Sequence, residues 1–123
     1  MATLRRDGSP RISGIEVEFT DGEVILGMMP GSLKARDLSR EPRLALHSAS
    51  DDPPEDDPGG WPGDAKIAGL AVELIGPGES EAAPHRFRVN VLEVVRTRVG
   101  DPADHLVIEP WHPGRGMERR IRR

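Results

Sequence analysis

The 123-residue sequence contains no cysteine, which excludes disulfide scaffolds, cysteine-ligated zinc, iron–sulfur clusters and thiol catalysis. Aromatic residues make up only 3% of the chain, and no apolar run is long enough to span a membrane. A basic excess is also absent, because the chain contains 17 Lys and Arg but 21 Asp and Glu. This balance argues against nucleic-acid binding. The start, MATLRRDGSPRIS, lacks the apolar core of a secretion signal. We therefore expect a cytoplasmic protein with neither nucleic-acid nor membrane partners.

Glycine and proline are abundant instead. The 14 glycines and 12 prolines make up about a fifth of the chain, against a usual combined share of about 12%. This composition favours a turn-rich fold over a helical bundle. The length fits one domain over residues 1–123.

The first third of the chain has the pattern of an antiparallel meander. Residues 11–19 alternate, with Ile15, Val17 and Phe19 on one face. Asp21-Gly22 is a strong hairpin signal, and the continuous apolar run 24–29 is typical of a buried strand.

One short helix is predicted over residues 32–42. Ser32 is a good N-cap and Pro42 ends the helix. Further strands are predicted over residues 43–49, 66–76, 85–100 and 105–111. Six or seven strands with one helix indicate an antiparallel barrel or sandwich.

Two charged segments stand apart from these strands. Residues 50–64 form an acidic, proline-rich stretch that we expect to be a mobile loop within the domain, with Trp61 as its anchor. The C-terminal residues 115–123 contain five arginines, which we interpret as a solvated tail.

The segment GMMPGSLKARDL carries the clearest chemical signal. A strand leads through a tight turn into a helix start that bears Ser32, Lys34 and Arg36. Free backbone N–H groups together with a hydroxyl, an ammonium and a guanidinium suit a phosphate. The alternative is a capped surface helix with ordinary solvated charges. The four histidines are too far apart to indicate a metal site.

Residues Ala2–His47, which include ATLRRDGSPRIS and DGEVILGMMPGSLKARDLSREPRLALH, resemble the pyridoxamine 5′-phosphate oxidase-like family. This is the flavin-binding split-barrel superfamily. GDAKIAGLAVEL at 63–74 is similar to the family's next strand, and the C-terminal region resembles the closing strands of actinobacterial-type members.

The resemblance implies a mainly β fold: a six-stranded antiparallel split β-barrel with one short helix after strand three. It also implies a homodimer with the cofactor, FMN or alternatively an F-420-type deazaflavin, at the interface. Ser32 and Lys34 match the residues that hold the cofactor phosphate, and Arg36 stands where many members are basic. The strand that would lie along the ring system contains Arg11, Ile12, Ser13 and Gly14. Met28 and Met29 would approach the cofactor from the strand before the phosphate turn.

The function implied is that of an oxidoreductase acting on a small molecule that the sequence does not identify. The cofactor would carry the hydride, and no catalytic side chain stands out. Leu33 replaces the arginine that strong FMN binders often have, and residues 51–64 lack a basic cluster for a substrate phosphate. The missing basic cluster argues against pyridoxamine phosphate oxidation, whereas Leu33 means that one contact to the cofactor phosphate is lost. The alternatives are a non-catalytic flavin-binding or sequestering module and a cofactor-free structural dimer.

Overall fold

The computed structural model describes residues 1–75, 80 and 82–123. These residues form two compact units, each built from separate parts of the chain. The first unit comprises Met1–Ala45 and Ala68–Val91, and the second comprises Leu46–Ile67 and Leu92–Arg123.

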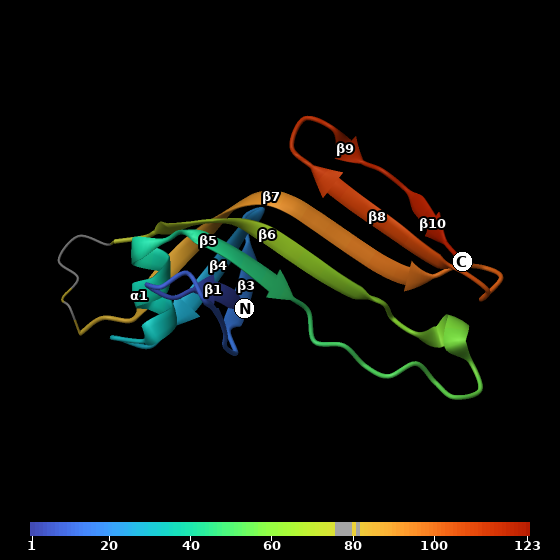
Figure 1. The fold of residues 1–123 in the computed structure, drawn as a ribbon, viewed down its shortest axis with the longest axis horizontal. Coiled ribbons are helices and arrows are strands. Elements are labelled where there is room, and N and C mark those ends of the chain that lie inside the picture. The colour runs from blue at the N-terminus through green and yellow to red at the C-terminus, as the bar shows by residue number, and fades with distance from the viewer. Residues whose placement is uncertain (76–79, 81) are drawn as a thin grey trace. The chain divides into compact units, whose positions relative to one another are not determined.

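The first unit is an antiparallel β-structure with one helix (Figure 1). Its hydrogen-bonded strand order is β7-β6-β5-β1-β2, while β4 pairs with both β7 and β3. The elements that contribute to it are β1 (Ala2–Leu4), β2 (Pro10–Ile12), β3 (Glu16–Thr20), β4 (Glu23–Met28), α1 (Leu33–Arg40), β5 (Arg43–His47), β6 (Asp64–Glu73) and β7 (His85–Val99), of which the last three continue into the second unit.

The Asp21-Gly22 hairpin is confirmed. Thr20 pairs with Glu23, so a two-residue turn joins β3 to β4. Asp21 and Gly22 both have positive φ, at 50° and 74°, as a type I′ turn requires.

Helix α1 packs on β1 through one side (Figure 1). Ala35 and Leu38 of the helix are buried, and the apolar core of this unit also includes Leu26, Phe87 and Val89. The helix begins after the Ser32 N-cap and has Glu41 as its C-cap, directly before Pro42. The predicted helix is therefore confirmed with slightly tighter bounds.

The second unit contains the C-terminal strands. These are β8 (Leu106–His112), β9 (Gly116–Met117) and β10 (Arg120–Arg122), and β8 pairs with β7, β9 and β10. Arg98 Nε donates to the buried Glu109 carboxylate at 2.9 Å. This hydrogen bond is the main reason that the pKa of Glu109 is lowered, and it outweighs the opposing effect of burial.

Segment 50–64 contains one 3-10 turn, η1 (Pro58–Gly60), before β6 begins. The indole Nε1 of Trp61 donates to the carbonyl of Asp51 at 2.8 Å. Trp61 thus fastens the end of this acidic segment to its beginning, as the anchor interpretation predicted.

The prediction of mainly antiparallel β-structure with one α-helix holds for the described residues, but the strand count of six was wrong. Ten strands are present there, their hydrogen-bonded order forms an open path, and α1 follows the fourth strand rather than the third. The expected strand over 11–19 is split because its two halves pair with different neighbours, Ile12 with Ala2 and Glu16 with Gly27. The arginine tail also contributes strand β10, whose side chains are exposed.

Candidate functional site

The turn before α1 is shaped by a glycine. Gly31 has φ of +72°, a conformation that side-chain-bearing residues rarely adopt. Ser32 then caps the helix, and its Oγ accepts from the backbone N–H of Ala35 at 3.4 Å. The predicted N-cap role of Ser32 is confirmed.

Lys34 connects α1 to the segment between β2 and β3. Its Nζ donates to the carbonyl of Gly14 at 2.6 Å, and the amino group of Met1 donates to the neighbouring carbonyl of Ser13 at 2.7 Å. Burial, and secondly the positive charge of Lys34, lower the pKa of the Met1 amine. Two cationic groups therefore hold the backbone at residues 13–14.

Lys34 also lines a cavity of about 530 Å³ in the first unit. Gly14 and Gly27 form part of its wall, and we call it the glycine-lined cavity. Its other lining residues are Ile15, Glu16, Met28, Met29, Pro30 and Pro84. Its volume is within the range of small-molecule sites.

Neither glycine of this cavity is required by the fold. Gly14 and Gly27 are not among the positive-φ glycines, and a Cβ atom built at either position meets nothing within 4 Å. Glycine at such positions lets a ligand approach the backbone closely. The backbone at Gly14, between β2 and β3, and at Gly27, in β4, is therefore open to this cavity.

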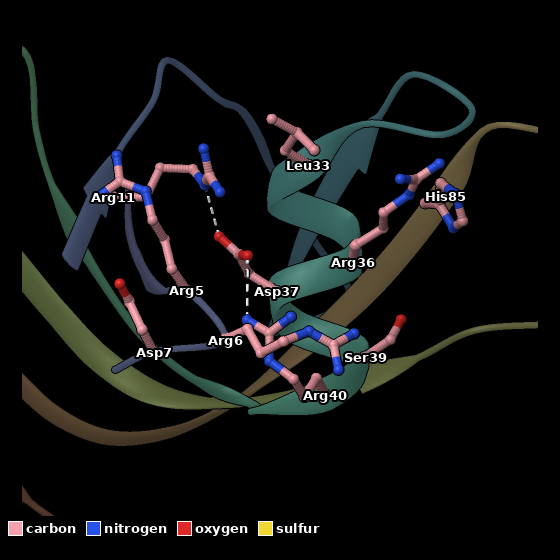
Figure 2. Close-up of a pocket in the computed structure, with 10 residues that line it drawn as sticks. All are labelled: Arg5, Arg6, Asp7, Arg11, Leu33, Arg36, Asp37, Ser39, Arg40 and His85. Carbon is pink, nitrogen blue, oxygen red and sulfur yellow. Dashed lines mark hydrogen bonds and ion pairs between the residues drawn. The ribbon is translucent and has the colours of Figure 1, made fainter. Parts of the chain in front are cut away.

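A second cavity, of about 880 Å³, lies on another side of α1 (Figure 2). We call it the arginine cavity, because five arginines line it together with His85. The arginines are Arg5, Arg6, Arg11, Arg36 and Arg40.

The buried Asp37 organises part of the arginine cavity. Its carboxylate accepts from Arg11 Nε at 2.7 Å and from Arg40 at 3.2 Å, and Figure 2 shows it between these two side chains. Thr3 Oγ1 donates to the same carboxylate at 2.8 Å. Burial alone raises the pKa of Asp37, but the hydrogen bonds from these three residues outweigh it and hold the pKa below the ordinary 3.8.

The residues predicted for one cofactor site are divided between the two cavities. Gly14, Met28, Met29 and Lys34 line the glycine-lined cavity, whereas Arg11 and Arg36 line the arginine cavity. Lys34 and Arg36 diverge because residues two apart on a helix point to nearly opposite sides.

The other three predicted residues, Ile12, Ser13 and Ser32, line neither cavity. The side chain of Ile12 is exposed to solvent. The Oγ of Ser13 is buried without a hydrogen-bond partner in the described part of the chain.

Sequence reasoning missed Gly27, Asp37 and His85. A glycine inside the apolar run 24–29 was the available signal for Gly27. An acid one residue before the buried Leu38 was the signal for Asp37. His85 Nε2 accepts from the N–H of Gly31 at 3.4 Å, a contact between residues 54 positions apart that has no local signal.

Each of the four histidines pairs with a carboxylate. The pairs are His47–Asp64, His85–Glu73, His105–Asp104 and His112–Glu93. Within residues 1–75, 80 and 82–123, no three His, Asp or Glu side chains are arranged to hold a metal ion.

No protein-family model matches the chain, and no curated protein sequence matches it. No helix in the described residues is long and apolar enough to cross a membrane.

Proposed function

We propose that this protein is a flavin- or deazaflavin-binding oxidoreductase of the pyridoxamine 5′-phosphate oxidase-like type. The proposal includes closure of its strands into a split barrel in a homodimer that has the cofactor at its interface. One observation carries it: Gly14, Met28, Met29 and Lys34 line a single cavity. The resemblance had assigned all four to cofactor binding from two separate parts of the sequence.

The residues of the glycine-lined cavity are compatible with such a cofactor. Lys34 uses one hydrogen-bond donor on Gly14, and an ammonium has three. Two donors therefore stay available for a phosphate beside the N-terminus of α1. The open space over Gly14 and Gly27 leaves room for a ring system to approach the backbone, and Met28 and Met29 offer adaptable apolar contacts.

The bound cofactor would supply hydride transfer, and this chain would supply binding and orientation. Lys34 would hold the phosphate while keeping the backbone at Gly14 in position.

A thermal-shift titration against FMN, FAD and the deazaflavin coenzyme tests the proposal. At a ligand concentration about 100 times the dissociation constant, we expect stabilisation of about 2.7 kcal/mol, or a rise of about 10 °C in Tm for a domain of this size. Lys34→Ala should abolish the rise. Lys66→Ala, which removes the only other lysine, should leave it unchanged.

Two outcomes would contradict the proposal: the absence of a saturable shift with any of the three ligands, or a full shift in Lys34→Ala.

A non-catalytic flavin-binding module is the second candidate. Lys34 and Glu16 are the only titratable side chains that line the glycine-lined cavity, within the described residues. The cavity therefore offers few side chains that could transfer a proton during catalysis. Turnover of reduced cofactor separates the two candidates, since a sequestering protein binds the cofactor without reoxidising it.

A further inference from the structure

The arginine cavity concentrates positive charge in an acidic protein. The chain has a formal net charge of −4, yet five of its arginines line this one cavity. Two aspartates, Asp7 and Asp37, also line it. Like charges held together repel one another unless an anion lies between them.

The two aspartates leave most of this charge uncompensated. Asp37 is shared by Arg11 and Arg40. Asp7 accepts from the N–H and the Oγ of Ser9, at 2.9 and 2.6 Å. Among the described residues, Arg5, Arg6 and Arg36 form no ion pair with a carboxylate, although the Ser9 hydrogen bonds and, to a lesser extent, the charge of Arg5 lower the pKa of Asp7.

Two of the guanidinium groups in this cavity, those of Arg11 and Arg40, are held in place by hydrogen bonds within the protein. Arg11 contacts Asp37 through Nε, so its two terminal nitrogens remain as donors. Arg40 uses one terminal nitrogen for both the Asp37 carboxylate and the carbonyl of Leu4, the latter at 2.7 Å. The buried carboxylate of Asp37, only 3% exposed, fixes both guanidinium groups before any ligand arrives. Such pre-organisation lowers the entropic cost of binding.

The geometry points to a second binding site in the arginine cavity, for a small organic phosphate, separate from the glycine-lined cavity. The guanidinium groups come from the β1–β2 connection, from β2 and from α1. Donors from several directions suit the three oxygens of a phosphate better than the two of a carboxylate.

Charge and size agree with this ligand. A phosphate monoester carries a charge of about −1.5 to −2, which three cations without a carboxylate partner can balance. The cavity of about 880 Å³ is larger than a bare phosphate needs. Leu33, 55% exposed, supplies an apolar wall for the organic part.

Arg6 and Arg36 are the residues to substitute. Both are exposed, and neither participates in the Asp37 ion pairs, so we expect their removal to leave the fold intact. Arg6→Ala/Arg36→Ala is compared with Arg115→Ala/Arg123→Ala, which removes two exposed arginines from the second unit and changes the net charge equally. The unfolding midpoint of each ligand-free double variant confirms that it is folded.

Calorimetric titration is performed in chloride buffer at constant ionic strength, with glucose 6-phosphate, inorganic phosphate and citrate as probes. We expect saturable binding of glucose 6-phosphate, at least ten-fold weaker in Arg6→Ala/Arg36→Ala and unchanged within two-fold in the control variant. Inorganic phosphate should bind the same site more weakly. Equal losses in both double variants, or citrate binding as tightly as glucose 6-phosphate, would overturn the assignment.

The flavin titration keeps this inference separate from the proposed function. Lys34→Ala should retain glucose 6-phosphate binding, and Arg6→Ala/Arg36→Ala should retain the flavin shift. If Arg6→Ala/Arg36→Ala loses both ligands, the arginine cavity is part of the cofactor site and the second site does not exist. If no flavin binds but glucose 6-phosphate does, the proposed function fails and this inference stands.

Discussion

Within the first unit, the carboxylate of Asp37 accepts hydrogen bonds from three different side chains. Thr3 from β1, Arg11 from β2 and Arg40 from α1 all donate to its carboxylate. A buried carboxylate with this many donors is stabilised in its charged form. One acid therefore connects three elements and shapes the arginine cavity.

Replacing this acid should destabilise the protein in a pH-dependent way. For Asp37→Asn we expect a free energy of unfolding about 2 kcal/mol lower at pH 7, because Arg11 and Arg40 lose a charged acceptor. The pKa of Asp37 is lowered in the folded state, so its contribution is present above the unfolded value of 3.8 and is lost as the pH falls through the folded-state pKa. Urea unfolding of both proteins from pH 7 to pH 2 measures this.

The difference in stability between wild type and Asp37→Asn should shrink below pH 3.8. Exposed Asp52 provides the control, and Asp52→Asn should match the wild type at each pH. A constant difference between wild type and Asp37→Asn across the whole range would contradict the ion-pair explanation.

Some of these residue roles could be predicted from the sequence and others could not. The capping role of Ser32 was predictable because a cap depends on local chain geometry. The role of Asp37 was not, because its partners Thr3 and Arg11 are 34 and 26 positions away. Lys34 and Arg36 were predicted to act on one phosphate, yet they line different cavities.

At the scale of elements, the β3–β4 hairpin carries two glycines with opposite roles. Gly22 lies in the turn with φ of +74°, whereas Gly27 lies in β4 without a positive φ. A Cβ atom at either position meets nothing within 4 Å, so backbone conformation alone decides the effect of alanine on stability.

Gly22→Ala should lower the free energy of unfolding by about 1 kcal/mol, because alanine resists the left-handed conformation. Gly27→Ala should raise it by about 0.5 kcal/mol, because glycine weakens a strand. Chemical denaturation of the two variants measures both values. Effects of the same sign would contradict this reading of the hairpin.

Gly27→Ala should also weaken flavin binding, since its methyl group enters the space against β4. Gly22→Ala should leave flavin binding unchanged, since Gly22 does not line that cavity. A Gly27→Ala variant with unaltered flavin affinity would argue against the ring lying over β4.

Element predictions succeeded where the pattern was local. The Asp21-Gly22 turn and the alternation in β5, where Leu44 and Leu46 are buried, could both be inferred from a few neighbouring residues. The break between β2 and β3 could not, because it depends on pairing with β1 and β4. The tail strand β10 was missed because its arginines indicate a solvated segment. Its strand conformation comes from pairing with β8.

At the scale of the whole molecule, several large apolar side chains are exposed, and the sequence did not predict this exposure. Phe19 was expected on the same face as Val17, which is half-buried, yet Phe19 is 71% exposed. Ile12 and Met29 in the same unit are 86% and 79% exposed. Exposed apolar side chains of this size mark an interface where they form one continuous surface.

If these side chains form the homodimer interface, the protein should sediment at twice its mass of 13.4 kDa. Phe19→Asp should shift it to the monomer, because an interface that buries a charge without a partner is strongly disfavoured. The same variant should lose flavin binding if the cofactor lies at the interface. Ile121→Asp, at an exposed position in the second unit, should remain dimeric and bind flavin. A monomeric wild type, or a dimer that only Ile121→Asp dissociates, would show that this apolar surface has another purpose.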